Sequence, residues 1–379
     1  MTSGARRLPA VYMRGGTSRG IMLNRKDLPQ DRAEWAPLFL AIMGSPDPNR
    51  RQLDGMGGGI SSLSKICVVG PSTRADADID YTFAQVDVTS PTVEFAGACG
   101  NMSSAVGPFA AQQGLVDTPA DGPVTLTVHD TNTGKLIRTR FAMSGGWPAT
   151  TGDTAIDGIA GTGAPVWLDF QDPAGTRTGA LFPTGLRSEL LGQGADTVRA
   201  SLMDVASPCV FLSMNDLGLK SLPTPDALTA DAQLLDRLET LRREASQRMG
   251  LTATETEAAA LRSVPRIGVV GPPAQQTTLS GESLTPDDMT IAIRMISMGD
   301  PHRAVPVTAA LCLAAAVGIE GTVPADVARP GDAPLRVGHP SGVTEVAAEV
   351  ATGPDGTPHV ASASVVRTSR ILFRGEVFY

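Results

Sequence analysis

The chain has 379 residues, of which 42% are hydrophobic and 18% are charged. This is enough apolar material for a sizeable core, so disorder along the whole chain is excluded. A formal net charge of −8 and only 4% aromatic residues argue against nucleic acid and anionic membranes as partners. No uninterrupted apolar run of about 18 residues predicts a membrane-spanning helix. A homodimer is the default expectation for a soluble oligomer.

The cysteines and histidines predict neither a disulfide framework nor a metal site. Cys67, Cys99, Cys209 and Cys312 lie far apart and form no CxxC pair. The four histidines lack the spacing of metal ligands. The segment Met1–Ala10 has no apolar core of a secretory signal, so we expect a cytoplasmic protein without a metal.

Short strands rich in Val, Ile and Thr dominate the chain, and Gly, Pro, Asn and Asp separate them. In the first half the predicted strands are Ala10–Met13, Ile21–Leu23, Ser64–Val69, Tyr81–Val88, Val124–His129, Leu136–Arg140 and Val166–Phe170. In the second half they are Ala200–Val205, Val210–Met214, Ile267–Val270, Leu335–Val337, Val343–Val350 and Ser364–Phe373. Charged or amphipathic patterns predict helices at Trp35–Met43, Asp231–Met249 and Pro286–Met298.

Two further predicted helices, Asn101–Gln113 and Val307–Val317, are almost uncharged on all faces. This pattern predicts that each helix is buried on every side. Each follows a polar segment suited to binding a ligand, Gly97–Gly100 in the first case and Asp300–Arg303 in the second. A buried helix among short strands in each half indicates an internal repeat.

The first candidate functional segment is the loop Arg14–Gly20, with sequence RGGTSRG. Its N–H and O–H groups can converge on an anion, although an ordinary glycine-rich turn is an equal alternative. The second glycine run, Gly55–Ile60, lacks the third glycine of a dinucleotide-binding fingerprint, and no Walker motif occurs. Nucleotide binding is therefore disfavoured.

Lys65 opens an apolar strand and follows this glycine run. Burial would remove solvent from its amine and favour the neutral form, which could then act as a base near neutral pH. The alternative is a lysine on an edge strand with its ammonium group in water.

Cys99 precedes the first uncharged helix, where the helix dipole stabilises a thiolate and free N–H groups suit a carboxylate. The alternative is a small buried cysteine before a capping Asn101. In the second half, Ser207 lies at a turn between strands, and Thr308 lies in the first turn of the second uncharged helix. Arg303 is a candidate carboxylate clamp. The other three cysteines are interpreted as core residues.

Ten blocks in order along the chain resemble the PrpF family of cofactor-independent isomerases. They are MRGGTSRG (13–20), MGSPD (43–47), RQLDGMGGG (51–59), SSLSK (61–65), DADIDYTFAQV (76–86), ACGNMSSAVGPFA (98–110), NTGK (132–135), FPTG (182–185), HPSG (339–342) and VRTSRILFRG (366–375). The resemblance implies an α+β, diaminopimelate-epimerase-like fold of two pseudo-symmetric domains, each a strand-rich barrel around a central buried helix. The expected domains are 1–186, with a returning strand at 366–379, and 187–365.

The resemblance also implies an allylic 1,3-proton shift, by double-bond migration or cis–trans isomerisation. The substrate would be a small anionic unsaturated di- or tricarboxylate such as 2-methylaconitate, methylitaconate or 4-oxalomesaconate. Lys65 and Cys99 match the family's catalytic lysine and cysteine. The matching substrate-binding positions are Thr17, Ser18, Gly100, Asn101, Met102, Ser103, Ser207, Arg303 and Thr308. Related racemases carry a second thiol at the start of the second central helix, where Ala304–Thr308 has none. The alternatives are an amino-acid racemase or epimerase on this fold and a catalytically silent carboxylate-binding protein.

Overall fold

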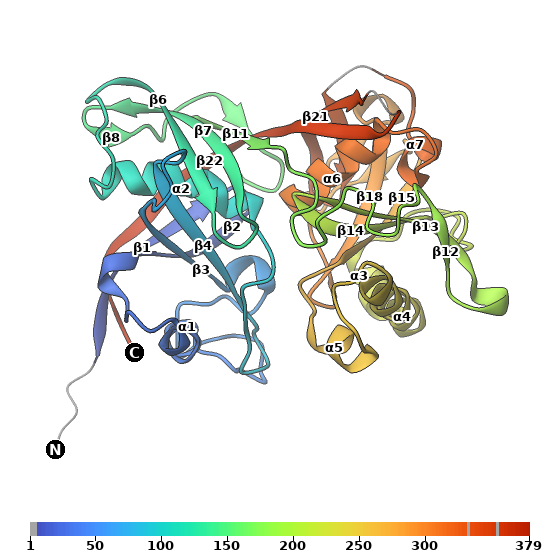
Figure 1. Ribbon diagram of the computed structural model, residues 1–379, viewed down its shortest axis with the longest axis horizontal. Coiled ribbons are helices and arrows are strands. Elements are labelled where there is room, and N and C mark those ends of the chain that lie inside the picture. The colour runs from blue at the N-terminus through green and yellow to red at the C-terminus, as the bar shows by residue number, and fades with distance from the viewer. Residues whose placement is uncertain (1–5, 332–333, 354–355) are drawn as a thin grey trace. The chain divides into compact units, whose positions relative to one another are not determined.

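The computed structural model describes residues 6–331, 334–353 and 356–379 (Figure 1). The chain forms two compact units, unit 1 with Met1–Leu168 and Val366–Tyr379, and unit 2 with Asp169–Val365. It passes from unit 1 to unit 2 within strand β11 (Pro165–Gln171) and returns within β22 (Pro358–Phe378). The boundary expected after residue 186 lies later in the chain than this first crossing.

Unit 1 is a barrel around one buried helix, α2. Its strands pair in the closed order β22, β1, β2, β3, β4, β6, β7, β11 and back to β22. The elements are β1 (Arg7–Gly15), β2 (Ser18–Asn24), η1 (Arg25–Asp27), η2 (Arg32–Glu34), α1 (Trp35–Met43), η3 (Ser61–Leu63), β3 (Lys65–Pro71), β4 (Ile79–Val86), β5 (Val93–Glu94), α2 (Gly100–Gln112), β6 (Gly122–Asp130), β7 (Lys135–Ser144), β8 (Trp147–Pro148), β9 (Thr154–Ala155) and β10 (Thr162–Gly163). Residues Gly100–Ala110 of α2 are all buried, which confirms the prediction from its uncharged sequence.

The strands of unit 2 curve around helix α6, which contacts β13, β14 and β21. Its elements are β12 (Glu189–Leu191), η4 (Gly194–Asp196), β13 (Val198–Val205), β14 (Ser207–Ser213), α3 (Pro225–Ala230), α4 (Ala232–Arg248), α5 (Glu255–Ala260), β15 (Arg266–Gly271), β16 (Gln276–Thr277), β17 (Ser283–Leu284), η5 (Pro286–Asp288), β18 (Ile291–Ser297), β19 (Asp300–Pro301), α6 (Val307–Val317), α7 (Val323–Val327), β20 (Leu335–His339) and β21 (Gly342–Thr352). Residues Val307–Ala316 of α6 are buried, again as predicted.

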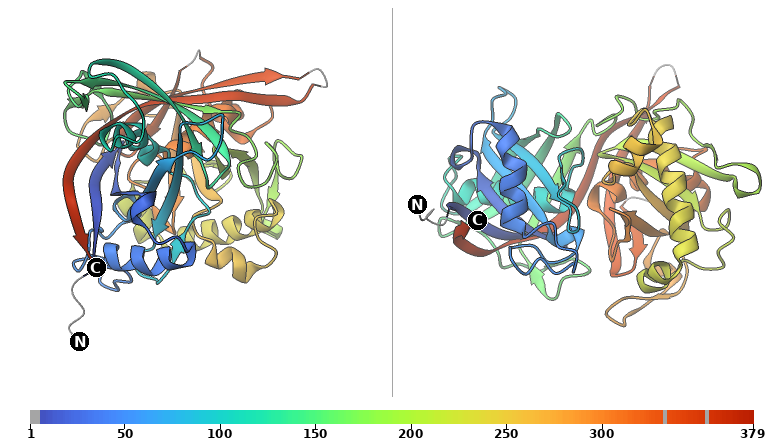
Figure 2. Two further views of the ribbon diagram at one scale, coloured as in Figure 1. Left: turned by 60° about the vertical axis from the view of Figure 1, so that its left-hand side comes forward. Right: turned by 90° about the horizontal axis from the view of Figure 1, so that it is seen from below.

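Helix α1 lies outside the sheet of unit 1, and α4, with the shorter α3 and α5 beside it, lies outside the sheet of unit 2 (blue and yellow in Figure 2). In α4 the buried stripe includes Leu234, Leu238 and Leu241, as the spacing of these leucines predicts. The side chain of Asp231 accepts the N–H of Leu234 and caps the helix. No helix in the described ranges has both the length and the apolarity needed to cross a bilayer.

The internal repeat is visible in one pair of strands. β3 begins with KICVVGP, and β15 begins the segment RIGVVGP. Each of these strands is parallel to one neighbour, β2 or β14, and antiparallel to the other, β4 or β18. Lys65 and Arg266 therefore occupy equivalent positions in the two units.

The predicted helix Pro286–Met298 is wrong. Only Pro286–Asp288 forms a short 3-10 turn, and Ile291–Ser297 is strand β18. This strand pairs with β15 on one side and β20 on the other, so nearly all of its residues are buried. A segment buried on both faces lacks the periodicity that separates a strand from a helix, and here the β-branched isoleucines favour the strand.

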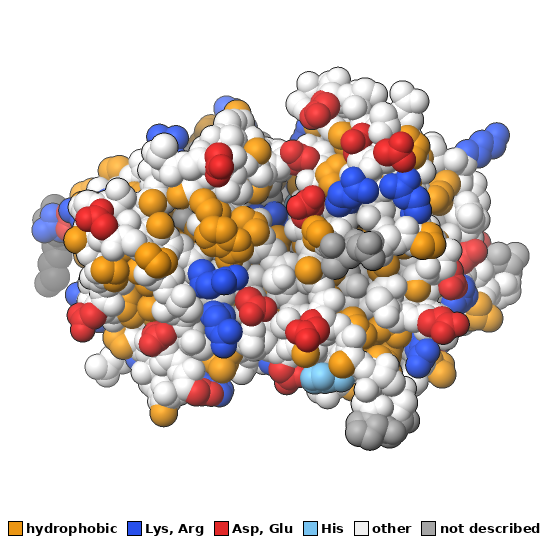
Figure 3. All heavy atoms as spheres, turned by 90° about the horizontal axis from the view of Figure 1, so that it is seen from above, with side chains coloured by type: hydrophobic (Ala, Val, Ile, Leu, Met, Phe, Trp, Pro, Cys, Tyr) orange, Lys and Arg blue, Asp and Glu red, His pale blue; other side chains and the backbone are white. Residues whose placement is uncertain are grey.

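Exposed tryptophans of unit 1 lie beneath arginines. The Arg374 guanidinium is 5.8 Å from the ring of Trp147, and that of Arg140 is 6.0 Å from the ring of Trp167. Figure 3 shows the same kind of surface, in which hydrophobic patches have basic side chains beside them. These contacts shield part of the apolar surface from water.

Asp130, at the end of β6, is a buried carboxyl group with 2% of its surface exposed. It accepts the N–H of Asn132 at 2.9 Å, and burial raises its pKa to about 6. The folded state therefore binds more protons than the unfolded state between about pH 4 and pH 6. The contribution of Asp130 to stability is greatest at acidic pH and falls as the pH rises through that window.

We expect Asp130→Asn to remove this pH dependence, because the amide keeps an acceptor for Asn132 but does not ionise. The variant should gain up to about 3 kcal/mol over wild type between pH 4 and pH 7. Urea unfolding of both proteins across this range measures the difference. Asp117→Asn, at an exposed position, is the control. A difference that does not change with pH would contradict the assignment.

Candidate active site

Lys65 is the first residue of β3, and only 7% of its surface is exposed. Because β3 lies between β2 and β4, the edge-strand alternative is wrong. The Nζ atom donates a hydrogen bond to Oε1 of Gln85 at 2.6 Å and lies 5.0 Å from the centre of the Phe83 ring. The amine is thus held between a neutral acceptor and an aromatic face.

Both groups that contact the amine are fixed by their neighbours. Gln85 is directly opposite Lys65 on β4, and its amide nitrogen donates to the carbonyl oxygens of Ser61 at 3.0 Å and Ser64 at 2.9 Å. These two bonds turn Oε1 toward Lys65. Asn132 accepts the N–H of Phe83 at 2.7 Å and donates to its carbonyl at 2.8 Å, which fixes the backbone that carries the ring.

The glycine run Gly55–Ile60 has a packing role. Gln52 is buried, donates to Oγ of Ser64 at 2.8 Å and accepts the N–H of Gly59 at 2.9 Å. A Cβ at Gly57 would overlap the amide of Gln52. The run therefore anchors the residue before Lys65.

The N-terminus of α2 presents free N–H groups next to a thiol. Cys99 is the N-cap residue, 9% exposed, and no side chain caps the helix. The first intrahelical bond runs from the N–H of Ser103 to the carbonyl of Cys99 at 2.9 Å, so the N–H groups of Gly100, Asn101 and Met102 have no acceptor within the helix. Such groups suit a carboxylate.

The loop between β1 and β2 packs directly on this helix end. Asn101 accepts the N–H of Thr17 at 3.3 Å and donates to its Oγ1 at 3.0 Å. A Cβ at Gly15 would lie 2.6 Å from the carbonyl oxygen of Asn101, and one at Gly16 would overlap its side chain. The structure thus brings the loop with Thr17 and the buried Ser18 to the start of α2, where Asn101–Ser103 lie. The binding roles of all these residues stay predictions.

Cys67 lies near both Lys65 and Cys99, since each of them affects the pKa of its thiol. Burial raises the pKa of Cys67 far above its usual value; the nearby Cys99 also raises it, while Lys65 lowers it. Its Sγ lies 3.8 Å from the hydroxyl of Tyr81. Cys67 is a core thiol that stays protonated, as the sequence predicted.

In unit 2 the predicted residues Ser207 and Thr308 share a partner. Nη1 of Arg266 donates to Oγ of Ser207 at 2.5 Å and to Oγ1 of Thr308 at 3.0 Å. The side chain of Arg303 is 59% exposed, and its guanidinium lies 3.8 Å from the carboxylate of Asp226. This is a weak surface ion pair. Its role as a carboxylate clamp stays a prediction.

Sequence reasoning missed Arg266 and Gln85. The repeated segments KICVVGP and RIGVVGP could have identified Arg266, since it stands where the other copy has Lys65. Gln85 carries no such signal, because only the register between β3 and β4 places it beside the amine.

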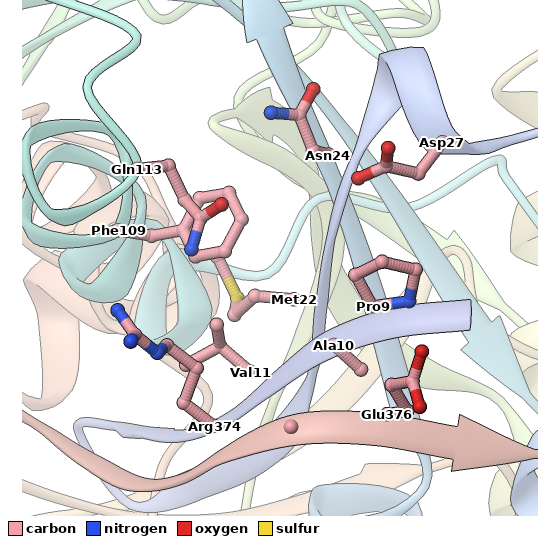
Figure 4. A pocket seen from close by; sticks show the side chains of 11 residues that line it. Pro9, Ala10, Val11, Met22, Asn24, Asp27, Phe109, Gln113, Arg374 and Glu376 are labelled. Carbon is pink, nitrogen blue, oxygen red and sulfur yellow. The ribbon is translucent and has the colours of Figure 1, made fainter. Parts of the chain in front are cut away.

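A cavity of about 360 Å³ lies at the opposite end of α2 (Figure 4). Met22 and Phe109 form part of an apolar wall, and Gln113 and Arg374 lie at its edge. None of the predicted site residues lines it, so it is not the candidate active site. Among the described residues, no group of three or more His, Cys, Asp or Glu could hold a metal ion.

Comparison with solved structures defines the class of the fold. The structure of a methylitaconate Δ-isomerase matches with a TM-score of 0.79 and 38% identity, over 99% of this chain and 96% of that one. A hydroxyproline epimerase from Agrobacterium vitis matches with a TM-score of 0.58 at 13% identity, over 98% and 93% of the two chains. The protein thus has the two-unit, epimerase-like α+β fold that the sequence predicts.

The chain belongs to the PrpF family, whose model, described as PrpF protein, matches residues 5–379. It is 39% identical to the 3-methylitaconate isomerase of Eubacterium barkeri over 98% of this chain and 97% of the relative. It is 36% identical to the 2-methyl-aconitate isomerase of Shewanella oneidensis over 98% and 96% of the two chains. It is also 36% identical to the (4E)-oxalomesaconate Δ-isomerase of a Novosphingobium species over 98% and 97%. These relatives are isomerases, in agreement with the class predicted from the sequence.

We expect Gly16→Ala to destabilise the protein by about 2 kcal/mol or more, because φ at Gly16 is +50° and a methyl group would overlap Asn101. Gly134→Ala is the matched control, since φ there is +73° but no atom lies within 4 Å of the added carbon. It should cost only about 1 kcal/mol from the backbone conformation. If urea unfolding showed the same loss of stability in both variants, the packing of Gly16 on Asn101 would contribute nothing to stability.

Proposed function

We propose that this protein is a cofactor-independent isomerase that moves a proton between the two ends of an allylic system in an unsaturated di- or tricarboxylate. The substrates named for its relatives, 3-methylitaconate, 2-methyl-aconitate and (4E)-oxalomesaconate, belong to this class. The observation that carries the proposal is the burial of the Lys65 amine, which donates a hydrogen bond to the neutral amide of Gln85. Burial disfavours the charged form of an amine, and the neutral form can act as a base.

In the proposed reaction, neutral Lys65 removes a proton from the carbon next to the double bond. The electron pair of that C–H bond spreads through the double bond into the adjoining carboxylate or keto group, which gives a dienolate. The Lys65 ammonium or the Cys99 thiol returns a proton, either at the other end of the allylic system or after its geometry has changed. If Cys99 supplies it, the Lys65 ammonium then loses its proton and the Cys99 thiolate regains one, which restores the enzyme. Acid–base catalysis of this kind contributes about 10²–10⁴-fold, so stabilisation of the dienolate must supply much of the remainder.

Binding roles are proposed for polar groups in both units. In unit 1 they are Thr17, Ser18, Gly100, Asn101, Met102 and Ser103, which gather at the helix end described above. In unit 2 they are Ser207 and Thr308, with Arg266 as the guanidinium that contacts both, and Arg303 as a second cation. A two-thiol racemase is disfavoured, because the first turn of α6 carries Thr308 and no cysteine. We place the reaction in the cytoplasm, where the four cysteines would stay free thiols.

The proposed proton transfer predicts deuterium at the allylic carbon when the reaction runs in D₂O, as NMR or mass spectrometry would detect. Lys65→Met, which fills the same volume without an amine, should lower kcat/KM by about 10²–10⁴-fold. Lys26→Met, at an exposed position, should leave the rate unchanged. The mechanism would be wrong if the isomerised product contained no deuterium and the Lys65→Met variant kept the wild-type rate. Binding of these acids without turnover would instead indicate a silent binding protein.

The Gln85→Glu variant tests the effect of replacing the neutral amide beside Lys65 with a carboxylate. A carboxylate 2.6 Å from Nζ would stabilise the ammonium form of Lys65. The acidic limb of the kcat/KM profile should therefore move to higher pH, whereas Gln193→Glu at an exposed position should leave it in place. A limb at the same pH in all three proteins would contradict the assignment of Lys65 as the titrating base.

A further inference from the structure

Arg367 is a buried arginine of β22 in unit 1, and 6% of its surface is exposed. One hydrogen bond of its guanidinium is to a neighbouring main chain: Nη1 donates to the carbonyl of Val366 at 2.9 Å. The Nε atom is buried and has no hydrogen-bond partner. A buried donor without an acceptor is costly, so this edge of the guanidinium needs a ligand, water or substrate to complete it.

The strand register shows which way Arg367 faces. Gly15 of β1 pairs with Ser369 of β22, and a Cβ at Gly15 would meet the backbone of Asn101 and Met102. Residues two apart on a strand face the same side, so Arg367 faces the N-terminus of α2 together with Ser369. A Cβ at Gly16 would overlap the side chain of Asn101 and lie 3.2 Å from Cδ of Arg367. The stem of Arg367 and the Asn101 amide therefore meet at this glycine.

The carboxylate of Asp157 lies near Arg367, whereas Arg14 and Arg370 are on the opposite face of the strands. Arg14, on the other face, donates to the carbonyl of Thr368 at 3.0 Å, and its pKa is lowered by burial and by nearby Arg370. Burial lowers the pKa of Arg367 to about 10, while the nearby carboxylate of Asp157 raises it. Arg367 therefore stays charged at neutral pH.

We propose that Arg367 binds a carboxylate of the substrate that does not react, in a subsite shared with the N–H groups at the start of α2. A guanidinium can hold a planar carboxylate with two parallel hydrogen bonds, and its unpartnered Nε belongs to one such edge. This subsite rests on the proposed function and deepens it. It makes Arg367 a specificity-determining residue that selects dicarboxylates over monocarboxylates.

The test compares Arg367→Lys with Arg370→Lys, its exposed neighbour on the opposite face of the strand. For an isomerised dicarboxylate, Arg367→Lys should raise KM about 10- to 100-fold, because lysine keeps the charge but loses the paired hydrogen bonds. For the monomethyl ester at the non-reacting carboxylate, wild type and Arg367→Lys should be equally poor. Arg370→Lys should match wild type on both. Equal KM values and equal acid-to-ester ratios in all three proteins would overturn the proposal.

Binding of propane-1,2,3-tricarboxylate, which has no double bond to shift, separates this inference from the proposed function. Calorimetry should show weaker binding to Arg367→Lys whether or not the wild type turns over a substrate. If the wild type binds this acid but isomerises none of its unsaturated analogues, the function fails and the subsite stands. If wild type and variant bind this acid with equal affinity, the proposed subsite is wrong. The subsite is also wrong if the wild type does not bind the acid. Arg367→Gln, checked by circular dichroism, replaces the lysine variant if that protein does not fold.

Discussion

The burial of the Lys65 amine is the constraint on which the arrangement of unit 1 depends. Removing an amine from water is unfavourable unless its donors find acceptors, and the barrel supplies Gln85 on the facing strand. The amide can accept this hydrogen bond only when its oxygen faces Lys65. The carbonyl groups of Ser61 and Ser64 fix this orientation by accepting from its nitrogen. The glycine run and Gln52 in turn anchor Ser64, so this segment serves to place a lysine.

The two units use the same strand for different chemistry. Lys65 in unit 1 and Arg266 in unit 2 begin equivalent strands. An amine can exchange a proton near neutral pH once it is buried, whereas a guanidinium keeps its charge and its fixed fork of donors. The repeat therefore gives unit 1 a candidate base and unit 2 a candidate anion-binding group, which contacts Ser207 and Thr308.

The sequence was most informative where one pattern had only one physical solution. The uncharged helices around Asn101 and Thr308 could only be buried, and both are. The segment Ile291–Ser297 was misjudged because its burial on both faces erases the periodicity that separates strand from helix. Lys65 and Cys99 could be singled out because glycines, hydroxyl groups and a helix start surround them in the sequence itself.

By itself the sequence determined the family, the strand-rich class of the fold, the two central helices and the candidate base. Only the tertiary structure decided which side chains meet that base and which arginines face the polar clusters. Gln85 is 20 residues from Lys65 along the chain, and Arg367 reaches Gly16 from the C-terminal strand. Strand register and barrel closure set such contacts, and both result from packing among distant segments rather than from local sequence.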